Sequence, residues 1–220
     1  MASRPVLSRE VIVAASIGLI DRDGPERFTL RRLGRALGCD PTAIYRHFRD
    51  KDELLRGIAD ELISDLTADL PRDAGWRAVV AESCVRLRRA LVAQPHLAAF
   101  ARSGPPLHPN EFALTERLLA ELHRAGLASR AAAAAYHALI ELTVGSAALD
   151  TAVEALTPDE RVATYAGWRR AYSTLDPVAH PWSVAAADHL YDGTAEDRFR
   201  YALDRLLDGI GGVPSATPGP

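Results

Sequence analysis

The segment Thr29–Lys51 constrains the fold most strongly, because signals that begin and end helices follow one another closely along it. Thr29 has the side chain of a helix cap, and Gly38 can end the helix that follows. Between them, apolar residues recur with the spacing i, i+3, i+7 of one helix face, at Leu30, Leu33 and Leu37. The pattern predicts a short amphipathic helix that ends in a tight turn.

A second helix is predicted directly after that turn. Asp40 can cap it, and Pro41 can occupy its first position, where the missing N–H costs nothing. Ile44 and Phe48 recur four residues apart, which places both on an inward face. Two short helices with this spacing are typical of a helix-turn-helix unit.

Helices are also predicted on both sides of this pair. Asp50 and Glu53 have capping-box spacing, so a third helix is expected to begin there. Upstream, Gly24 can end a preceding helix, and that helix has an apolar stripe at Ile12, Ala15, Ser16 and Leu19. The first part of the chain is therefore expected to be a small bundle of helices.

Charge is distributed unevenly along the chain. The net charge is −3, but residues 29–51 contain six Lys and Arg against two Asp and Glu. Screening limits the range of each charge to about 8–10 Å in physiological salt, so a local positive patch on an acidic protein is enough to bind phosphate. The charge pattern therefore permits a nucleic-acid contact at this segment.

The pattern FTLRRLGRALGCDPTAIYRHFRDKDELL resembles the amino-terminal domain of the TetR family of one-component bacterial repressors. The resemblance covers roughly residues 8–65. It implies an all-α protein with an N-terminal three-helix helix-turn-helix domain at 1–65, which binds double-stranded operator DNA. A larger helical domain for ligand binding and dimerisation is expected at 66–210, and a disordered tail at 211–220.

The resemblance also implies which residues contact DNA. Contacts to the sugar-phosphate backbone are expected from Thr29, Arg31, Arg32, Tyr45, His47 and Lys51. Contacts to base edges are expected from Pro41, Thr42, Ala43 and Arg46. Arg4 and Arg9 are further candidates for a minor-groove contact. The alternative for each of these positions is a solvated helix face.

Beyond residue 66 the chain consists of longer Ala- and Leu-rich stretches with Pro and Gly breaks. Helices are predicted near 75–93, 95–102, 110–125, 129–155, 158–173, 182–191 and 195–210. Thr157, Pro158 and Glu160 form a cap, an N1 proline and a box glutamate in register, and Asn110 and Thr194 are candidate caps. Gly126 suits the end of a helix.

Two of these helices are candidates for a homodimer interface. The helix near 129–155 has small or apolar side chains around most of its circumference, at Leu139, Ile140, Leu142, Val144, Ala147, Ala148 and Leu149. In TetR-like proteins this helix and the last one pair with their copies in a second subunit. The last helix would contribute Leu203, Leu206, Leu207 and Ile210 to this interface. The alternative is an intrachain core.

The carboxy-terminal part also resembles the tetracycline repressors, which implies a small organic inducer inside the second domain. Candidate ligand-binding residues combine apolar walls with a few polar anchors and are Ser83, Leu87, His96, Phe100, Arg102, Ser103, Phe112 and His137. Where those repressors have an Asn and a metal-binding His, this chain has Ser83 and Phe100. A tetracycline–magnesium complex is therefore not expected.

The remaining patterns exclude other classes of protein. Cys39 and Cys84 lie far apart and predict two reduced thiols, while the histidines have no metal-ligand spacing, so neither a metal nor a cofactor is expected. No apolar run is judged long and clean enough for a membrane span, and a cytoplasmic protein is expected. An enzyme is not expected, because no nucleophile lies beside a base. The alternatives are a helical enzyme or small-molecule carrier with a vestigial DNA-binding domain, and a ligand-free chromosome-binding protein.

Overall fold

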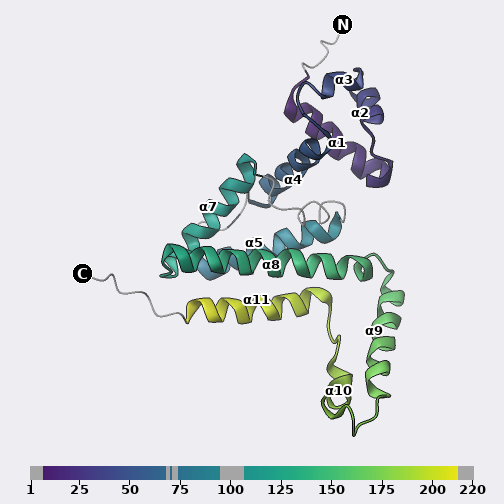
Figure 1. Ribbon diagram of the computed structural model, residues 1–220, viewed down its shortest axis with the longest axis vertical. Helices are drawn as coiled ribbons and strands as arrows, with labels where there is room; N and C mark the ends of the chain where they lie inside the picture. Colours follow the sequence, from purple (N-terminus) through teal and green to yellow (C-terminus); the bar gives the residue numbers. More distant parts are fainter. Residues whose placement is uncertain (1–6, 68–69, 71–73, 95–106, 213–220) are drawn as a thin grey trace, which may run out of the picture. The chain divides into compact units, whose positions relative to one another are not determined.

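The computed structural model describes residues 7–67, 70, 74–94 and 107–212, and every regular element in these ranges is a helix (Figure 1). This confirms the all-α class. The helix expected at 95–102 lies outside the described residues, as does the expected tail from residue 213 onward. The chain divides into two compact units: unit 1 is Met1–Pro71 with His96–Leu118, and unit 2 is Arg72–Pro95 with Leu119–Pro220.

Unit 1 begins with four helices and one short 3₁₀ turn. These are α1 (Arg9–Asp23), η1 (Pro25–Arg27), α2 (Leu30–Leu37), α3 (Pro41–Ile44) and α4 (Lys51–Thr67). Helix α1 packs against both α2 and α4, and α2 packs against α3. Their inward faces contain side chains that are almost fully buried, at Ile12, Leu33, Ile44, Phe48, Leu54 and Ile58. Burial of these apolar side chains is the main source of stability for this part of unit 1.

The helix caps of unit 1 follow the sequence prediction closely. The hydroxyl of Thr29 accepts a hydrogen bond from the backbone N–H of Arg32 at 3.2 Å, and a carboxylate oxygen of Asp40 accepts one from Thr42 N–H at 2.8 Å. Gly38 ends α2 in the left-handed conformation, with φ 63°. A Cβ at Gly34 would lie 2.9 Å from the carbonyl oxygen of Cys39, so the turn after α2 requires glycine there as well.

Helix α3 is shorter than its apolar stripe suggested. It ends at Ile44, and the chain continues through tighter turns in which His47 N–H donates to the carbonyl of Ile44. Phe48 lies beyond the helix but is still buried. The inward direction of Ile44 and Phe48 is therefore confirmed, although only Ile44 belongs to the helix.

Unit 2 is built on three long helices that lie side by side in Figure 1. These are α5 (Trp76–Ala93), α8 (Ser129–Glu154) and α11 (Ala195–Gly211). Val79, Val80, Leu139 and Leu207 are buried between them. The ends of these helices agree with the prediction within two residues, and Gly211 extends α11 into the expected tail.

A buried charge pair links α5 and α8 inside this core. Arg88 of α5 is only 3% exposed, and its guanidinium donates to Ser146 at 3.0 Å and to the carboxylate of Asp150 at 2.7 Å. The same guanidinium lies over the ring of Phe199 of α11, 5.3 Å from the ring centroid. The side chain thus connects all three long helices.

The segment between α8 and α11 contains α9 (Pro158–Ser173), α10 (Pro181–Ala186) and η2 (Ala187–His189). Helix α9 packs against both α10 and η2, and we call these three elements the arm. The capping box of Thr157 and Glu160 and the cap at Thr194 are confirmed. The single helix expected at 182–191 is wrong in its length, since Tyr191 has φ 60°, which a right-handed helix cannot accommodate.

Helix α7 (Pro109–Arg124) begins in unit 1, and its last turns are assigned to unit 2. Asn110 was expected to cap this helix but lies inside it. The cap is instead Asp60 of α4, whose carboxylate accepts hydrogen bonds from the backbone N–H groups of Asn110 at 3.3 Å and Glu111 at 2.8 Å. Gly126 ends α7 as predicted, with φ 93°.

Helix α8 was expected to be buried on more than one side, but several of its apolar side chains are partly or largely exposed. Leu139 and Ala147 are fully buried, whereas Leu149 is 82% exposed and Ile140, Leu142, Val144 and Ala148 are half-buried. In α11, Leu203, Leu207 and Ile210 are buried and Leu206 is half-buried. A single chain therefore covers one face of each helix.

Helix α8 also contradicts one expectation about membranes. The stretch Ser129–Val153 is 25 residues long with a mean hydropathy of 1.3, which is apolar and long enough to cross a bilayer. The expectation that no such run exists is therefore wrong on length and composition. The stretch packs against α5 and α11, and its Ser146 and Asp150 bind Arg88, so it forms part of the core of unit 2.

Candidate nucleic-acid interface

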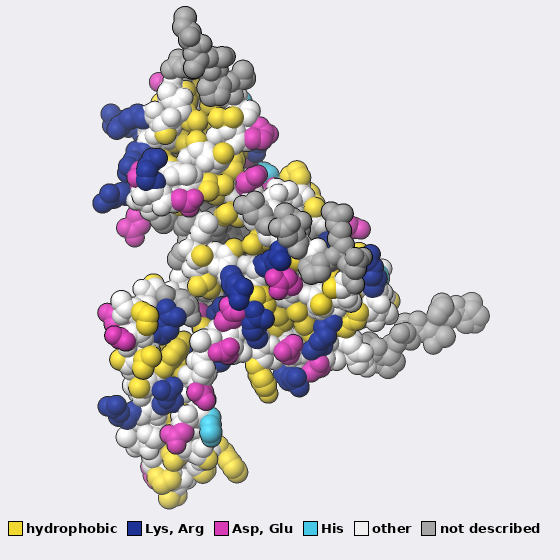
Figure 2. All heavy atoms as spheres, turned by 180° about the vertical axis from the view of Figure 1, so that it is seen from behind, with side chains coloured by type: hydrophobic (Ala, Val, Ile, Leu, Met, Phe, Trp, Pro, Cys, Tyr) yellow, Lys and Arg dark blue, Asp and Glu magenta, His cyan; other side chains and the backbone are white. Residues whose placement is uncertain are grey.

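Helix α2 and the turn that follows α3 present side chains that have no hydrogen-bond or ion-pair partner among the described residues. Arg31 and Arg46 are exposed and Tyr45 is 52% exposed. No described residue forms a hydrogen bond or an ion pair with any of these three side chains. Figure 2 shows Lys and Arg side chains projecting from one edge of unit 1. Two guanidinium groups and a phenol are thus available to an external partner that accepts hydrogen bonds.

Other predicted contact residues are held by internal interactions. The guanidinium of Arg32 donates to the carboxylate of Asp23 at 2.6 Å. The hydroxyl of Thr42 donates to Asp40 at 2.7 Å, and this bond is the main reason that the pKa of Asp40 is lowered. The hydroxyl of Thr29 caps α2. These side chains position the two helices, and Thr29 and Thr42 also remain exposed to a partner.

The remaining predicted contacts line the same segment. Lys51 is exposed, with its ammonium 6.0 Å from the ring centroid of Phe28, while His47, Pro41 and Ala43 are half-buried. Pro41 and Ala43 lie on α3, and His47 follows it in the turn. The structure therefore places all ten predicted DNA-contact residues between the cap of α2 and the first residue of α4, on the two short helices and the turn that follows α3.

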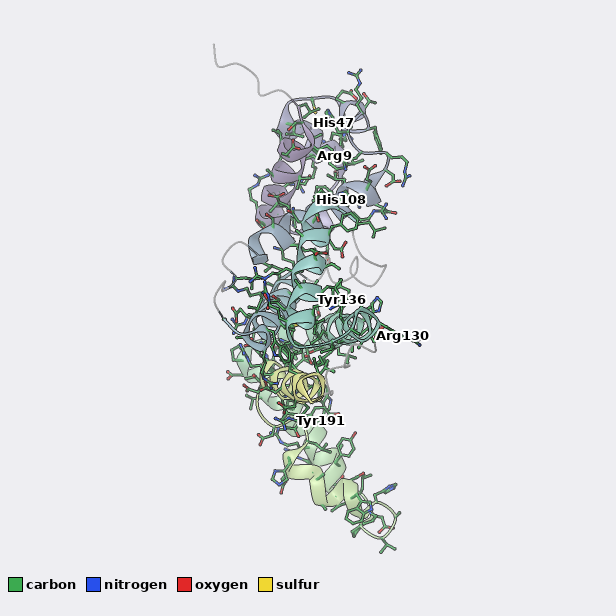
Figure 3. All side chains as sticks on the ribbon, turned by 90° about the vertical axis from the view of Figure 1, so that its left-hand side faces the viewer. Arg9, His47, His108, Arg130, Tyr136 and Tyr191 are labelled. Carbon is green, nitrogen blue, oxygen red and sulfur yellow. The ribbon has the colours of Figure 1, made fainter. Side chains whose placement is uncertain are left out.

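Arg9 has a structural role that the sequence did not reveal. Its guanidinium donates to the carbonyl oxygen of His47 and to the carboxylate of Glu53 at 2.9 Å, and it lies 4.2 Å from the ring centroid of Phe48 (Figure 3). The expectation of a minor-groove contact is therefore not supported for Arg9. Arg4 lies outside the described residues.

Glu53 connects the start of α4 to the turn after α3. Its other carboxylate oxygen accepts a hydrogen bond from Arg49 N–H at 2.7 Å, while Asp50 accepts one from Glu53 N–H at 2.7 Å. The bond from Arg49 N–H, followed by the one from Arg9, lowers the pKa of Glu53. The predicted capping box is thus present with one difference. The Glu53 side chain accepts its hydrogen bond from the N–H of Arg49, one residue before Asp50. Arg9 and Glu53 together hold the turn that follows α3 against α1 and α4.

Arg35 is a further exposed residue that the sequence reasoning missed. It lies in the last turn of α2 and, like Arg31, has no partner among the described side chains. Its spacing of four residues from Arg31 was the available signal, because residues at i and i+4 share a helix face.

The predicted ligand-binding residues are distributed over both units. Ser83 is buried on α5, where its hydroxyl donates to the carbonyl of Val79 at 2.8 Å, and Leu87 is half-buried on the same helix. Phe112 on α7 and His137 on α8 are exposed. The other four predicted residues, His96, Phe100, Arg102 and Ser103, lie outside the described residues.

The thiols and potential metal ligands show no reactive site in the described ranges. Cys39 and Cys84 are both free. Burial raises the pKa of Cys84 to about 11, so this thiol is protonated at neutral pH. Across the described residues, no group of three or more His, Cys, Asp or Glu could hold a metal ion.

Comparisons with known proteins agree with this architecture. Residues 69–213 match the family model of the tetracyclin repressor-like C-terminal domain, and residues 12–58 match that of bacterial regulatory proteins of the tetR family. An HTH-type transcriptional regulator of Saccharopolyspora erythraea is 30% identical over 149 residues, which are 68% of this chain and 63% of that protein. The alignment thus spans less than two thirds of that relative's length.

Two further similarities extend the comparison. The tetracycline repressor protein class C of Escherichia coli is 31% identical over 151 residues, which are 68% of each chain. The solved structure of the Streptomyces coelicolor TetR family protein ActR in complex with actinorhodin is 25% identical, with a TM-score of 0.81, and the match covers 93% of this chain and 97% of that one. Since the match at residues 69–213 alone exceeds half of the sequence, the chain belongs to the tetR family of bacterial regulatory proteins.

Proposed function

We propose that this protein is a ligand-responsive DNA-binding transcriptional regulator, a repressor that a small organic molecule releases from its operator. The observation that carries the proposal is that Arg31, Tyr45 and Arg46 of a helix-turn-helix have exposed side chains without a hydrogen-bond or ion-pair partner among the described residues. Residues 1–65 form the DNA-binding domain, and residues 66–210 form the ligand-binding and dimerisation domain. The protein acts in the cytoplasm and catalyses no reaction.

The ten predicted contacts divide into two groups on DNA. Arg46, with Pro41, Thr42 and Ala43, faces base edges, and its guanidinium can bind a guanine through two parallel hydrogen bonds. Thr29, Arg31, Arg32, Tyr45, His47 and Lys51 bind phosphates and set the position of the domain. The guanidinium of Arg32 already donates to Asp23, so it can offer only its remaining N–H groups to a phosphate. We therefore expect Arg32 to contribute less to operator affinity than Arg31.

A homodimer through α8 and α11 completes the binding unit. Ile140 and Val144 of α8 are half-buried and Tyr201 of α11 is 69% exposed, which leaves apolar surface available to a second copy. Two helix-turn-helix units in a twofold dimer read half-sites about 34–36 Å apart, one turn of the duplex. The dimer thereby doubles the contacts that one short unit can make.

The contact between Asp60 and the start of α7 supplies a route for ligand control. Asp60 lies on α4, the helix that follows the DNA-contacting turn, and is only 6% exposed. It holds the first N–H groups of α7, where Glu111 is 8% exposed with one carboxylate oxygen lacking a hydrogen-bond partner. A ligand that moves the start of α7 therefore acts directly on α4. A coupling free energy of about 1–3 kcal/mol changes operator affinity roughly 5–150-fold.

The inducer is proposed to bind in the second domain, near Ser83, Leu87, His96, Phe100, Arg102, Ser103, Phe112 and His137. The similarity to ActR, which was solved with actinorhodin, supports a small-molecule inducer.

The test compares the wild type with Tyr45→Ala in gel retardation against fragments of its own genome at low ionic strength. We expect the wild type to retard a subset of fragments with an affinity that falls steeply with salt. We expect Tyr45→Ala to abolish this binding while circular dichroism and the oligomeric state stay unchanged, because the side chain is exposed. Operator affinity like that of the wild type in the variant would contradict the assigned role, and no retardation by the wild type would favour the enzyme or carrier alternative.

A further inference from the structure

A pocket of about 500 Å³ opens in unit 2, where the end of α8, the arm and the start of α11 meet. Its volume lies within the range of small-molecule sites, about 300–1,000 Å³. Of the ligand-binding residues expected from the sequence, the four that the structure describes do not line it. The walls are formed by Leu149, Asp150, Val153, Tyr165, Trp168, Ala171, Tyr172, Tyr191 and Arg198.

Four aromatic rings form one wall of the pocket, with Tyr191 at their centre. The Tyr191 ring centroid lies 4.9 Å from that of Trp168, 6.0 Å from that of Tyr165 and 6.4 Å from that of Tyr172. The rings of Tyr165 and Tyr191 are nearly parallel, with an interplanar angle of 12°. Such a wall offers flat faces on which another aromatic ring can stack.

The backbone that positions Tyr191, a residue labelled in Figure 3, is held in an uncommon conformation. Tyr191 has φ 60°, a value that few residues other than glycine adopt. Arg169 donates to the carbonyl of Tyr191 at 3.2 Å, and Arg198 donates to the carbonyls of Asp192 and Gly193 at 3.4 and 3.2 Å. Two guanidinium groups therefore fix the loop that places the central ring. Strained backbone of this kind is concentrated at functional sites.

The charge inside the pocket is positive and lacks an acidic partner. The guanidinium of Arg198 donates to the phenol oxygen of Tyr165 at 2.7 Å and lies 4.8 Å from its ring centroid, but no described carboxylate is within ion-pair distance of it. Other arginines of α11 are paired, since Arg200 binds Glu196 and Arg205 binds Asp208. The one acid in the lining, Asp150, is already bound to Arg88.

We propose that this pocket is a binding site for a planar aromatic molecule with an anionic substituent. The ring system stacks on Trp168 and Tyr191, and the anion pairs with the guanidinium of Arg198. Charge-assisted hydrogen bonds to a guanidinium are among the stronger polar contacts in proteins, so the anion determines the selectivity. The pocket lining contains none of the described residues of the predicted inducer site, and the proposal does not depend on the proposed operator binding.

The experiment uses 8-anilinonaphthalene-1-sulfonate, an aromatic anion, as the probe on the full chain without DNA. Fluorescence titration and calorimetry are expected to give one site per chain in the wild type. Arg198→Gln should weaken binding by at least about tenfold, because it removes a charge-assisted contact. The matched control is Arg200→Gln on the same helix, which lies outside the pocket and should change the affinity less than about twofold.

A second pair of measurements separates the two parts of the site. N-phenyl-1-naphthylamine, which lacks the sulfonate, should bind more weakly than the anion. Arg198→Gln should weaken the binding of this neutral probe less than that of the anion, because the neutral probe loses only the support of the loop and no charge-assisted contact. Trp168→Ala should weaken both probes, because the stacking face is lost. This variant also keeps the proposal testable if Arg198→Gln fails to fold.

Three outcomes would overturn the proposal. One is equal binding of the anionic probe by Arg198→Gln and Arg200→Gln, and another is binding without a defined stoichiometry. The third is a wild type that does not bind the probe but becomes monomeric on Arg198→Gln in light scattering, which would show that a second copy of the chain fills the pocket.

Discussion

Three arginines on the long helices of unit 2 and two arginines on the helix-turn-helix of unit 1 differ in whether they have a carboxylate partner. In unit 2, Arg77, Arg88 and Arg89 each bind a carboxylate at 2.6–2.8 Å. On the helix-turn-helix of unit 1, Arg31 and Arg46 have no partner among the described residues. Paired charges contribute to the fold of the chain that contains them, whereas unpaired charges remain available for a ligand of opposite sign. The difference indicates function more clearly than the count of basic residues.

The largest effect should come from breaking the buried pair of unit 2. Asp150→Asn leaves the almost fully buried guanidinium of Arg88 without a counter-charge, so we expect a loss of about 3–5 kcal/mol in the free energy of unfolding. Urea unfolding followed by circular dichroism measures it. The double variant Arg88→Met with Asp150→Leu should recover most of this loss. A single variant as stable as the wild type would show that this pair does not stabilise unit 2.

In unit 1, removing an exposed arginine is expected to weaken DNA binding. Arg46→Ala should cost about 1–3 kcal/mol in operator affinity and relax the choice of one base pair, because it removes a contact to a base edge. Arg31→Ala should weaken binding to all sequences and reduce the slope of log affinity against log salt by about one, because it removes a phosphate contact. Gel retardation at several salt concentrations measures both effects. The control is Arg77→Ala, because Arg77 is paired with Asp208 in unit 2. If Arg31→Ala and Arg46→Ala change operator affinity no more than Arg77→Ala does, the absence of carboxylate partners in unit 1 does not indicate a DNA contact.

A smaller effect is expected where unit 1 does use a charge internally. Asp60→Asn removes the negative charge that caps α7, so we expect a loss of about 1–2 kcal/mol in the free energy of unfolding. The matched control is Asp52→Asn, because Asp52 is exposed on the same helix. Thermal unfolding of both variants measures the difference. Equal stability would argue against this cap and against the proposed route from α7 to α4.

The smallest effect is expected on the free energy of unfolding at low pH. Hydrogen bonds from Arg49 N–H and Arg9 lower the pKa of Glu53 below the ordinary value of 4.5. Its contribution to stability is therefore complete above about pH 4.5 and is lost as the pH falls through the lower folded pKa. We expect Glu53→Gln to lower stability at pH 7 by less than about 1 kcal/mol and to flatten the decline in acid, because the pair is partly exposed. Unfolding at pH 7 and pH 3 tests this, and an equally steep decline in both proteins would be inconsistent with it.

Local signals predicted the elements of both units well. Thr29, Gly38 and Thr157 mark helix ends because a cap requires only a side chain and a backbone a few residues apart. The family pattern likewise identified the helix-turn-helix, since its residues are contiguous in sequence. The aromatic wall around Tyr191 was not predicted, because Tyr165 and Trp168 reach it from a different helix.

The sequence alone determined the all-α fold, most of the helix ends and the position of the helix-turn-helix, because each of these depends on neighbours along the backbone. Only the tertiary structure decided that Asp60 caps a helix 50 residues away, that Arg9 supports the turn after α3, and which arginines stay unpaired. These contacts depend on how helices pack, and the sequence within any one helix does not specify its partner across the core.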